Sequence, residues 1–526
     1  MRSPSSSHVF AKLPSVNIPR SAFRRDRTYK TAFNSGYLIP FYLDEVLPGD
    51  TFNLGVTAFA RLSTPIVPFM DNLYLDFFFF FVPNRLVWNH WEHFNGYQEN
   101  PGDSTDFLVP QITMNPAVGN LGDYFGLPVG NQITVSALPF RCYNLIWNEF
   151  FRDENFQDSL PVYKDDGPDP LNYTTSSGTT TTTYAIRKRG KRKDYFTSCL
   201  PTPQRGPGVE LPLGGIAPVV DMASNLLPLK FYANDGSYSP NGNLGIYNGT
   251  AHVVSGSFTG SALSKVGLGA DLSAVNAVTI NTMRQAFQIQ RLYERDNLGG
   301  TRYFEILVAH FGVRSPDSRL QRPEYLGGGS SPVQIHTVAQ TSSTDSTSPQ
   351  GNLAAVGVAG SNQIGFSKSF VEHGYIIGLV CARADLTYQQ GIDRHWSRRS
   401  RFDFYWPALA HLGEQAVLNK EIYADGTSAD NQVFGYQERW AEYRYGISKI
   451  TGKLRSGVGG SLDVWHLSQY FANRPTLGPT FIMEDPPLSR VLAVQDEPQF
   501  IFDSIVSVNC VRPMPVYSVP GLIDHF

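Results

Sequence analysis

Two histidines and several carboxylates have the residue types best suited to metal or acid–base chemistry. His90 and His93 lie three residues apart in HWEHF, so both would lie on one face of a helix and could hold a metal ion. No third ligand is evident, and we expect His90 in the core and His93 at the surface. Adjacent carboxylates such as Glu484 and Asp485 are too common to mark a catalytic pair. Neither pattern predicts a functional site.

Motifs for other chemistries are missing from the sequence. There is no GxSxG elbow, P-loop, HExxH or strand-linked Rossmann fingerprint, and the glycines at 327–329 lack the following lysine of a phosphate loop. The four cysteines, Cys142, Cys199, Cys381 and Cys510, are far apart in the sequence, which indicates reduced core thiols. The sequence predicts a protein without enzymatic activity, catalytic residues, cofactor or metal site.

Composition and charge suggest a protein with many turns and covered surfaces. The 526 residues include 47 Gly and 36 Pro, with 13% aromatic and only 17% charged residues. Residues 1–36 carry seven cations against one acid, whereas the whole chain has a net charge of −3. A basic arm ahead of a mildly acidic body suits neutralisation of phosphates; the alternative is a solvated tail. The N-terminus has no apolar core, so we expect no signal peptide, and no segment is apolar enough to span a membrane.

Strands that alternate apolar and polar side chains must form the body that positions these charges. Residues 51–61 alternate apolar and polar side chains, which indicates a half-buried strand, and residues 37–47 form another extended run before a turn. Further strands are predicted at 302–313, 375–388, 401–406 and 499–511. Helices are predicted at 84–94, 139–153 and 281–297. The pattern predicts an all-β core with few helices.

Five consecutive phenylalanines, Phe77–Phe81, form the most apolar of these strands. Phe77, Phe79 and Phe81 would share one face, and Phe78 and Phe80 the other. A strand that is apolar on both faces must be covered on both sides. It is either an interior strand of an ordinary large domain or part of a sheet whose second face lies under an inserted segment or a neighbouring molecule.

Two segments in the middle of the chain have unusual compositions. Residues 172–193 join a Thr-rich tract to six cations within residues 187–193. Residues 211–279 are almost free of charge and rich in Gly, Ser, Asn, Ala and Tyr, as in recognition loops. We interpret the second segment as a folded insertion; the alternative is a disordered one.

Seven stretches resemble one family along the whole chain. They are IPRSAF (18–23), FYLDEVLPGDTFNL (41–54), PIVPFMDNLYLDFFFFFVPNRLVWNHW (65–91), DYFTSCLPTPQRG (194–206), RQAFQIQRLYERDNLGGTRYFEIL (284–307), SPDSRLQRPEYLGG (315–328) and RPMPVYSVPGLIDHF (512–526). The chain resembles the major capsid proteins of the microviruses (Microviridae), small tailless icosahedral single-stranded DNA bacteriophages, in particular the gokushovirus branch. Residues 174–184 and 211–278 match weakly.

The resemblance implies a fold and an assembly. The fold would be a single eight-stranded antiparallel jelly roll with very long helix- and loop-containing insertions, spanning 37–526, with Phe77, Phe79 and Phe81 in the barrel core. Sixty copies would close into a T=1 shell around a circular single-stranded DNA genome. The family also implies an internal scaffolding protein, a DNA pilot protein and a small basic internal protein as partners. The protein would reside in the virion, and in the host bacterial cytoplasm during assembly.

Two sets of residues are predicted to contact partners. The arm, residues 1–36, would face the capsid interior, and the DNA-facing residues would be Arg20, Arg24, Arg25, Arg27, Lys30, Arg187, Lys188, Arg189, Lys191, Arg192 and Lys193. For residues 187–193 a solvated or inter-subunit loop is an equal alternative. The insertion 211–279 would form a threefold protrusion whose tip binds a bacterial surface receptor such as a glycan, through Asn234, Tyr238, Asn241, Asn243, Tyr247 and Asn248. The alternative is a tip that binds nothing.

Rival functions predict features that the sequence lacks. An enzyme or lectin on a jelly roll would show paired carboxylates or an aromatic platform in one cleft, and no stretch singles out such a cleft. A tail or spike protein would show repeats or fibrous segments, and we find none.

Overall fold

The computed structural model describes residues 19–209, 219–221, 231–232, 238–239, 268–270, 280–300, 302–312, 321–346, 348–385 and 387–517. Two compact units are present, one formed by residues 1–205 and 294–526 and the other by Gly206–Tyr293.

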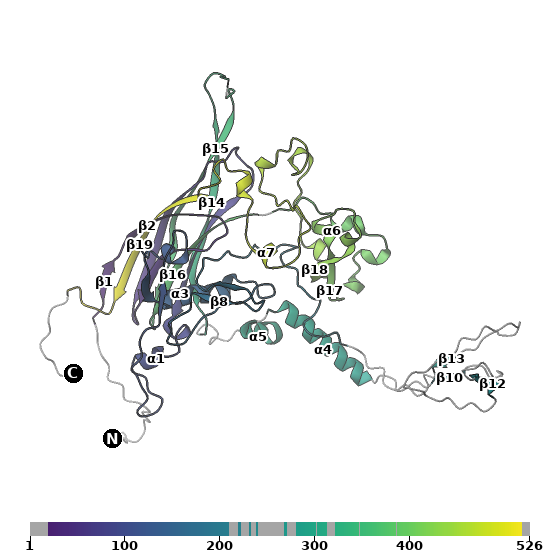
Figure 1. The fold of residues 1–526 in the computed structure, drawn as a ribbon, viewed down its shortest axis with the longest axis horizontal. Helices are drawn as coiled ribbons and strands as arrows, with labels where there is room; N and C mark the ends of the chain where they lie inside the picture. Colours follow the sequence, from purple (N-terminus) through teal and green to yellow (C-terminus); the bar gives the residue numbers. More distant parts are fainter. Residues whose placement is uncertain are drawn as a thin grey trace, which may run out of the picture. The chain divides into compact units, whose positions relative to one another are not determined.

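One large antiparallel sheet dominates the first unit (Figure 1). It has nine strands in the order β1-β19-β4-β15-β14-β5-β16-β3, and β2 pairs with β19 beside β1. The strands are β1 (Ser21–Arg24), β2 (Arg27–Phe33), β3 (Ile39–Val46), β4 (Thr51–Leu62), β5 (Leu73–Pro83), β14 (Glu324–Ala339), β15 (Leu353–Ser369), β16 (Gly374–Ala384) and β19 (Phe500–Arg512). Strands from both ends of the chain therefore pair in one sheet.

Aromatic contacts show that this sheet curls. The ring centroid of Phe502 in β19 lies 6.0 Å from that of Phe41 in β3, although these strands stand near opposite ends of the sheet order. The Phe502 ring also lies 6.2 Å from the ring of Phe77 in β5. One apolar core is therefore enclosed by the concave face of the sheet. The fold is mostly antiparallel β with few helices, which confirms the predicted all-β core; the eight-stranded jelly roll stays a prediction.

The phenylalanine run is β5, and both of its faces are covered. Phe77, Phe79 and Phe81 are buried in the concave core. On the other face the Phe80 ring lies 4.7 Å from that of Phe150, and the Phe78 ring lies 5.3 Å from that of Phe151. Both partners come from the π-helical turn (Trp147–Phe151) that follows α3 (Leu138–Ile146). An inserted segment of the same chain therefore covers the second face.

Smaller elements surround this sheet. A separate apolar cluster lies between the hairpin β17 (Glu414–Leu418) and β18 (Val433–Glu438) and the short helices α6 (Asn419–Ile422) and α7 (Pro479–Ile482). Other short elements are α2 (Leu121–Tyr124) and the strand pairs β6 (Gln111–Met114) with β7 (Ile133–Ser136) and β8 (Asn172–Thr174) with β9 (Thr180–Thr182). All four cysteines are buried and free. Within the described residues, no helix is long and apolar enough to cross a membrane.

Several predicted elements differ from the structure. The predicted strand 302–313 is the helix α5 (Tyr303–Phe311), because the Glu305 carboxylate accepts a hydrogen bond from the Arg302 N–H in the first turn and Gly312, at φ 68°, ends the helix. The predicted strand 401–406 begins instead with a 3-10 turn, η6 (Arg401–Asp403). The predicted helix 84–94 is reduced to the turn η1 (Asn84–Leu86) and α1 (Trp91–Phe94). The predicted helix 281–297 is confirmed as α4 (Ile280–Leu298).

The second unit contains the predicted insertion 211–279. Its described elements are the strand pairs β10 (Val219–Asp221) with β13 (Leu268–Ala270) and β11 (Phe231–Tyr232) with β12 (Tyr238–Ser239).

Candidate nucleic-acid interface

Part of the predicted basic arm belongs to the sheet. Residues 21–33 form β1 and β2, both paired with β19. The Arg25 guanidinium donates two hydrogen bonds of 3.0 Å to the Asp44 carboxylate in β3. Arg27 lies 4.1 Å above the Tyr42 ring and donates to the Leu43 carbonyl. These two arginines link β1 and β2 to β3 at the opposite end of the sheet order.

The other arm cations are more exposed. Arg24 is paired with Asp26 at 2.6 Å, but its side chain is 81% exposed. Lys30 lies 3.8 Å from Asp503, and both side chains are mostly exposed. Arg20 donates to the Thr51 hydroxyl at the start of β4. Because exposed ion pairs are weak, Arg24 and Lys30 are available to an anionic partner.

The cations of residues 187–193 all have partners within the chain. Arg189 pairs with Asp76 at 2.7 Å, and the Lys191 ammonium donates to Gln469 at 2.9 Å in a buried position. Burial lowers the Lys191 pKa to about 8. The remaining contacts, listed by cation, are Arg187 with the Thr182 carbonyl, Lys188 with Asp485, Arg192 with Asp385, and Lys193 with Asp153. Arg189 and Lys191 therefore stabilise the interior, while Arg192 and Lys193, more than half exposed, remain able to meet a ligand.

Asp76 is the buried acid that receives this basic segment. Its Oδ2 accepts from Arg189 at 2.7 Å and from Arg383 at 2.8 Å, and its Oδ1 accepts from the Ser330 hydroxyl at 2.6 Å. The carboxylate thus joins β5, β14, β16 and residues 187–193. Sequence reasoning missed this site, because the only signal was one acid directly before five phenylalanines.

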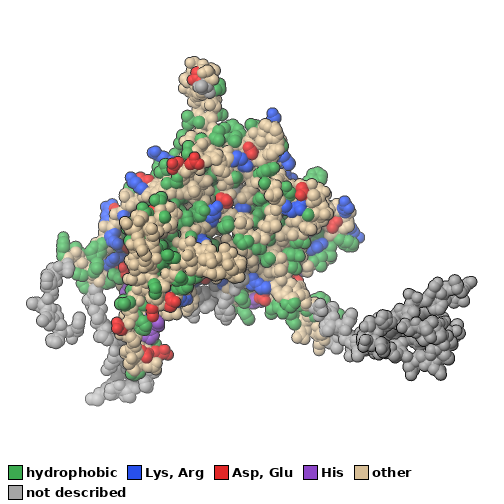
Figure 2. Space-filling model, in the orientation of Figure 1, with side chains coloured by type: hydrophobic (Ala, Val, Ile, Leu, Met, Phe, Trp, Pro, Cys, Tyr) green, Lys and Arg blue, Asp and Glu red, His purple; other side chains and the backbone are tan. Residues whose placement is uncertain are grey.

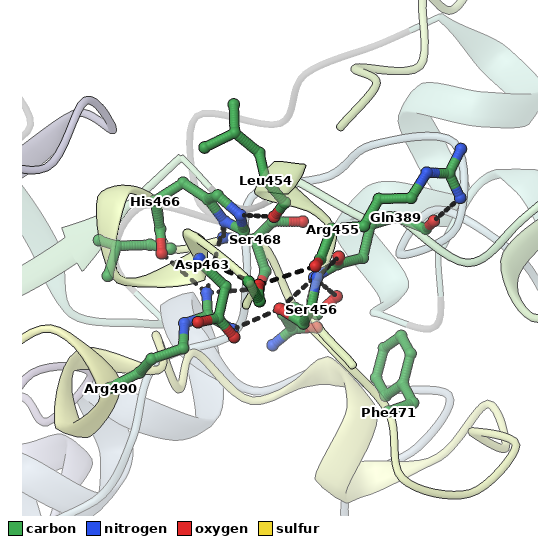
Figure 3. Close-up of polar contacts among 12 residues, drawn as sticks. Gln389, Leu454, Arg455, Ser456, Asp463, His466, Ser468, Phe471 and Arg490 are labelled. Atoms are coloured by element: carbon green, nitrogen blue, oxygen red, sulfur yellow. Dashed lines mark hydrogen bonds and ion pairs between the residues drawn. The ribbon is translucent and has the colours of Figure 1, made fainter. Parts of the chain in front are cut away.

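A polar cluster around His466 has residue types found in hydrolases, yet its geometry is different (Figure 3). The Ser468 N–H donates to His466 Nδ1 at 3.1 Å, so Nε2 carries the proton and donates to the Leu454 carbonyl. The Ser456 hydroxyl is bonded to Gln389 and Arg490 and not to the imidazole. A nucleophile needs a base within hydrogen-bond reach, so this cluster ties loops together and has no paired nucleophile.

The predicted histidine pair also has a structural role. His90 Nδ1 lies 2.9 Å from Asp166 Oδ1, and His93 Nδ1 lies 3.0 Å from the Tyr97 carbonyl oxygen. Both side chains are half-buried, so the expectation of a core His90 was wrong. Across the described part of the chain, no group of three or more His, Cys, Asp or Glu side chains is placed to hold a metal ion.

The predicted receptor-binding tip is largely outside the described residues. This applies to Asn234, Asn241, Asn243, Tyr247 and Asn248, whereas Tyr238 begins strand β12. On the face of the molecule in Figure 2, Lys and Arg side chains lie among Asp and Glu and do not form one continuous basic patch. The cations on this face therefore occur in local groups.

One such group was missed in the sequence. Residues 394–406, RHWSRRSRFDFYW, alternate arginines with aromatic residues, and every residue of 399–406 is exposed. The alternation of Arg with Phe, Tyr and Trp was the available signal, and the strand assigned to 401–406 concealed it.

Comparison with known proteins places the chain in a family. The family described as "Capsid protein (F protein)" matches residues 11–522. "Capsid protein VP1" of Bdellovibrio phage phiMH2K is 47% identical, covering 99% of this chain and 98% of its own length. "Capsid protein VP1" of Chlamydia phage 1 is 44% identical over 98% and 97%, and that of Spiroplasma virus 4 is 38% identical over 98% and 97%. These relatives are from gokushovirus-type microviruses. The chain is a structural, non-enzymatic protein, and it belongs to the microvirus capsid protein (F protein) family.

Proposed function

We propose that sixty copies of this chain assemble into a T=1 icosahedral shell that encloses a circular single-stranded DNA genome. The observation that carries the proposal is the match to capsid proteins over nearly the whole chain.

The exposed face of the sheet supports self-assembly. Phe59 in β4 is 43% exposed, and Ile501 and Ile505 in β19 are 63% and 50% exposed. These strands are paired over twelve positions, so the three side chains occupy one continuous face. Exposed apolar surface of this kind is typical of contacts between subunits, and neighbouring copies of the chain would cover it.

The curled sheet supports a jelly-roll body. In this proposal eight of its strands form the two facing sheets of the barrel, and the remaining strand extends one edge. In the proposed body, the insertions are the helix-containing segments 84–209 and 280–312, the segment 211–279 and the long segment 385–499.

DNA contact is proposed for the exposed members of the predicted set. Arg24, Lys30, Arg192 and Lys193 combine exposure with weak pairing, whereas Arg25, Arg189 and Lys191 also hold the fold together. Replacing Arg24 and Lys30 by Gln should leave shells intact and lower the salt concentration at which the genome is released. Unchanged salt release would contradict this assignment.

Host attachment is proposed for the insertion 211–279 as a threefold protrusion. Its uncharged Asn, Ser and Tyr side chains suit sugar hydroxyl groups. Exchanging residues 234–260 for the loop of a related phage should keep particle yield and change adsorption to host cells. Equal adsorption would contradict a receptor-binding role.

Three further partners follow from the family and stay proposals: an internal scaffolding protein, a DNA pilot protein and a small basic internal protein. The virion is the proposed location, with assembly in the host bacterial cytoplasm. Expressing the chain with and without the scaffolding protein, followed by electron microscopy, tests the requirement for scaffolding. Closed shells in both samples would remove that partner from the proposal.

A further inference from the structure

The arginine–aromatic segment, residues 394–406, displays an unusual amount of aromatic surface. The exposed fractions are 74% for Trp396, 64% for Phe402, 51% for Phe404, 48% for Tyr405 and 42% for Trp406. Exposed aromatic side chains in such number are typical of contact sites. The segment lies beside β17 and α6, far along the chain from the cations predicted to face DNA.

The segment is held rigidly. Three short 3-10 turns, η5 (Arg394–Ser397), η6 (Arg401–Asp403) and η7 (Pro407–Leu409), set its path. The Asp403 carboxylate accepts hydrogen bonds from the Arg399 and Ser400 N–H groups at 2.9 and 2.7 Å. These bonds lower the pKa of Asp403, so the turn stays capped at neutral pH. The rings are therefore presented in a fixed arrangement, which reduces the entropy cost of binding.

Two arginines anchor the segment and neutralise the nearby acids. Arg394 pairs with Glu421 at 2.9 Å, and Arg398 pairs with Glu442 at 3.2 Å. Arg398 also lies 4.5 Å above the Tyr443 ring. The acids at the base of the segment are thus already satisfied by these two cations and by backbone donors.

Three further guanidinium groups remain without a carboxylate partner within the described residues: those of Arg399, Arg401 and Arg439. Arg401 lies 4.7 Å above the exposed Trp406 ring, and Arg439 lies 4.7 Å above the Trp440 ring. The buried Nε of Arg439 also has no hydrogen-bond partner. Arg399 and Arg401 therefore give the segment excess positive charge beside the exposed Trp406 ring, and Arg439 adds a cation over the buried Trp440 ring.

A polar pocket opens at the base of the segment. Its volume is about 230 Å³, and its lining includes Arg394, Arg398, Lys420, Arg439 and Trp440. Four cations line this pocket together with three acids, and each of the acids is already ion-paired or hydrogen-bonded. The pocket therefore favours an anionic group that fits its volume, such as a phosphodiester.

We propose that the arginine–aromatic segment binds single-stranded DNA. Bases stack on Trp396, Phe402 and Trp406, and phosphates lie beside Arg399, Arg401 and Arg439. Single-stranded nucleic acid has flat bases that can stack on the exposed rings and regularly spaced phosphates that can pair with the guanidinium groups. Stacking and arginine contacts of this kind do not depend on the base sequence. The inference rests on the proposed enclosure of a single-stranded genome and adds a site that stacks bases.

A matched pair of double variants tests the proposal. In Arg401→Gln/Trp406→Leu the exposed cation–ring pair of the segment is removed. In the control, Phe59→Leu/Arg61→Gln, another exposed cation–ring pair, with 5.3 Å between Arg61 and the Phe59 ring, is removed from β4. Binding of the purified full chain to a fluorescein-labelled 20-nucleotide oligo(dT) is measured by fluorescence anisotropy across a range of salt concentrations.

The first variant should bind at least about tenfold more weakly than wild type, because one stacked base and one phosphate contact are lost. The slope of log affinity against log salt should fall by about 0.7, whereas the control should leave affinity and slope unchanged. A second variant, Phe402→Ser, removes a ring 64% exposed without touching any ion pair, and it should also weaken binding. Circular dichroism establishes that each variant is folded.

Other outcomes overturn the inference in distinguishable ways. Wild-type affinity in Arg401→Gln/Trp406→Leu and Phe402→Ser would exclude this segment as a DNA site and leave the shell proposal intact. Normal oligonucleotide binding with loss of shell formation would assign the surface to a second copy of the chain. Absence of binding by wild type, together with closed but empty shells, would overturn both this site and the enclosure of DNA while retaining the shell.

Discussion

Replacing Asp76 by Asn should lower the free energy of unfolding by about 3 kcal/mol. The carboxylate accepts from Arg189, Arg383 and Ser330 within a nearly dry site, where the side chains of Asp76 and Arg383 are 9% exposed. Asn removes the charge and one acceptor. Arg383 keeps Asp385 at 2.9 Å, but Arg189 retains no ion-pair partner among the described residues. Leaving one buried charge uncompensated typically costs about 3–5 kcal/mol, and the remaining amide oxygen places this case at the lower end.

Urea unfolding of the unassembled chain, followed by tryptophan fluorescence, measures this effect. The matched control is Asp503→Asn, the same chemical change at an exposed ion pair with Lys30, which should shift stability by less than about 0.5 kcal/mol. If Asp76→Asn and Asp503→Asn unfold at the same urea concentration, Asp76 does not hold β5, β14, β16 and residues 187–193 together.

Three further changes test packing and burial. Gly374→Ala would place a Cβ 2.3 Å from the Val82 carbonyl oxygen and should abolish soluble folded protein, whereas Gly360→Ala, with open space around the new atom, should express normally. Phe79→Ala empties a fully buried ring from the core and should cost about 3–5 kcal/mol in the same urea assay; a cost below 1 kcal/mol would contradict the packing described. Burial raises the pKa of Glu484 to about 7, so folding favours its protonated form, and its contribution is present below the ordinary value of 4.5 and lost as pH rises through 7. Glu484→Gln should remove about 3 kcal/mol of pH dependence between pH 5 and 8, and an unchanged pH profile of stability would refute this role.

The strands of the sheet were predictable from the sequence where one pattern of apolar and polar residues dominated a segment. The alternation of residues 51–61 fixes the inner and outer faces of β4, and the apolar run of β5 requires cover on both faces. The helix α5 was not predictable in the same way, because the short apolar stretch YFEILVAHF suits a buried strand or a helix. The hydrogen bond from the Arg302 N–H to the Glu305 carboxylate stabilises the first turn of the helix.

The candidate sites were harder to predict than the strands. A cluster of cations such as residues 187–193 suggests a surface, yet its buried partners are distant in sequence, and Asp76 and Gln469 lie 113 and 278 residues from Arg189 and Lys191. Residues 394–406 likewise depend on acids at 421 and 442 that neutralise two arginines and leave others free. Such pairings are set by the tertiary fold and leave no local signal.

This chain is proposed to enclose DNA as a closed shell of sixty copies. Charge-detection mass spectrometry of purified particles, before and after the DNA is removed, tests it most directly. Sixty chains of 58.4 kDa predict an empty protein shell of about 3.5 MDa, and intact particles should be heavier by the mass of the genome. A protein mass that corresponds to another copy number, or a chain that remains monomeric under all assembly conditions, would contradict the account.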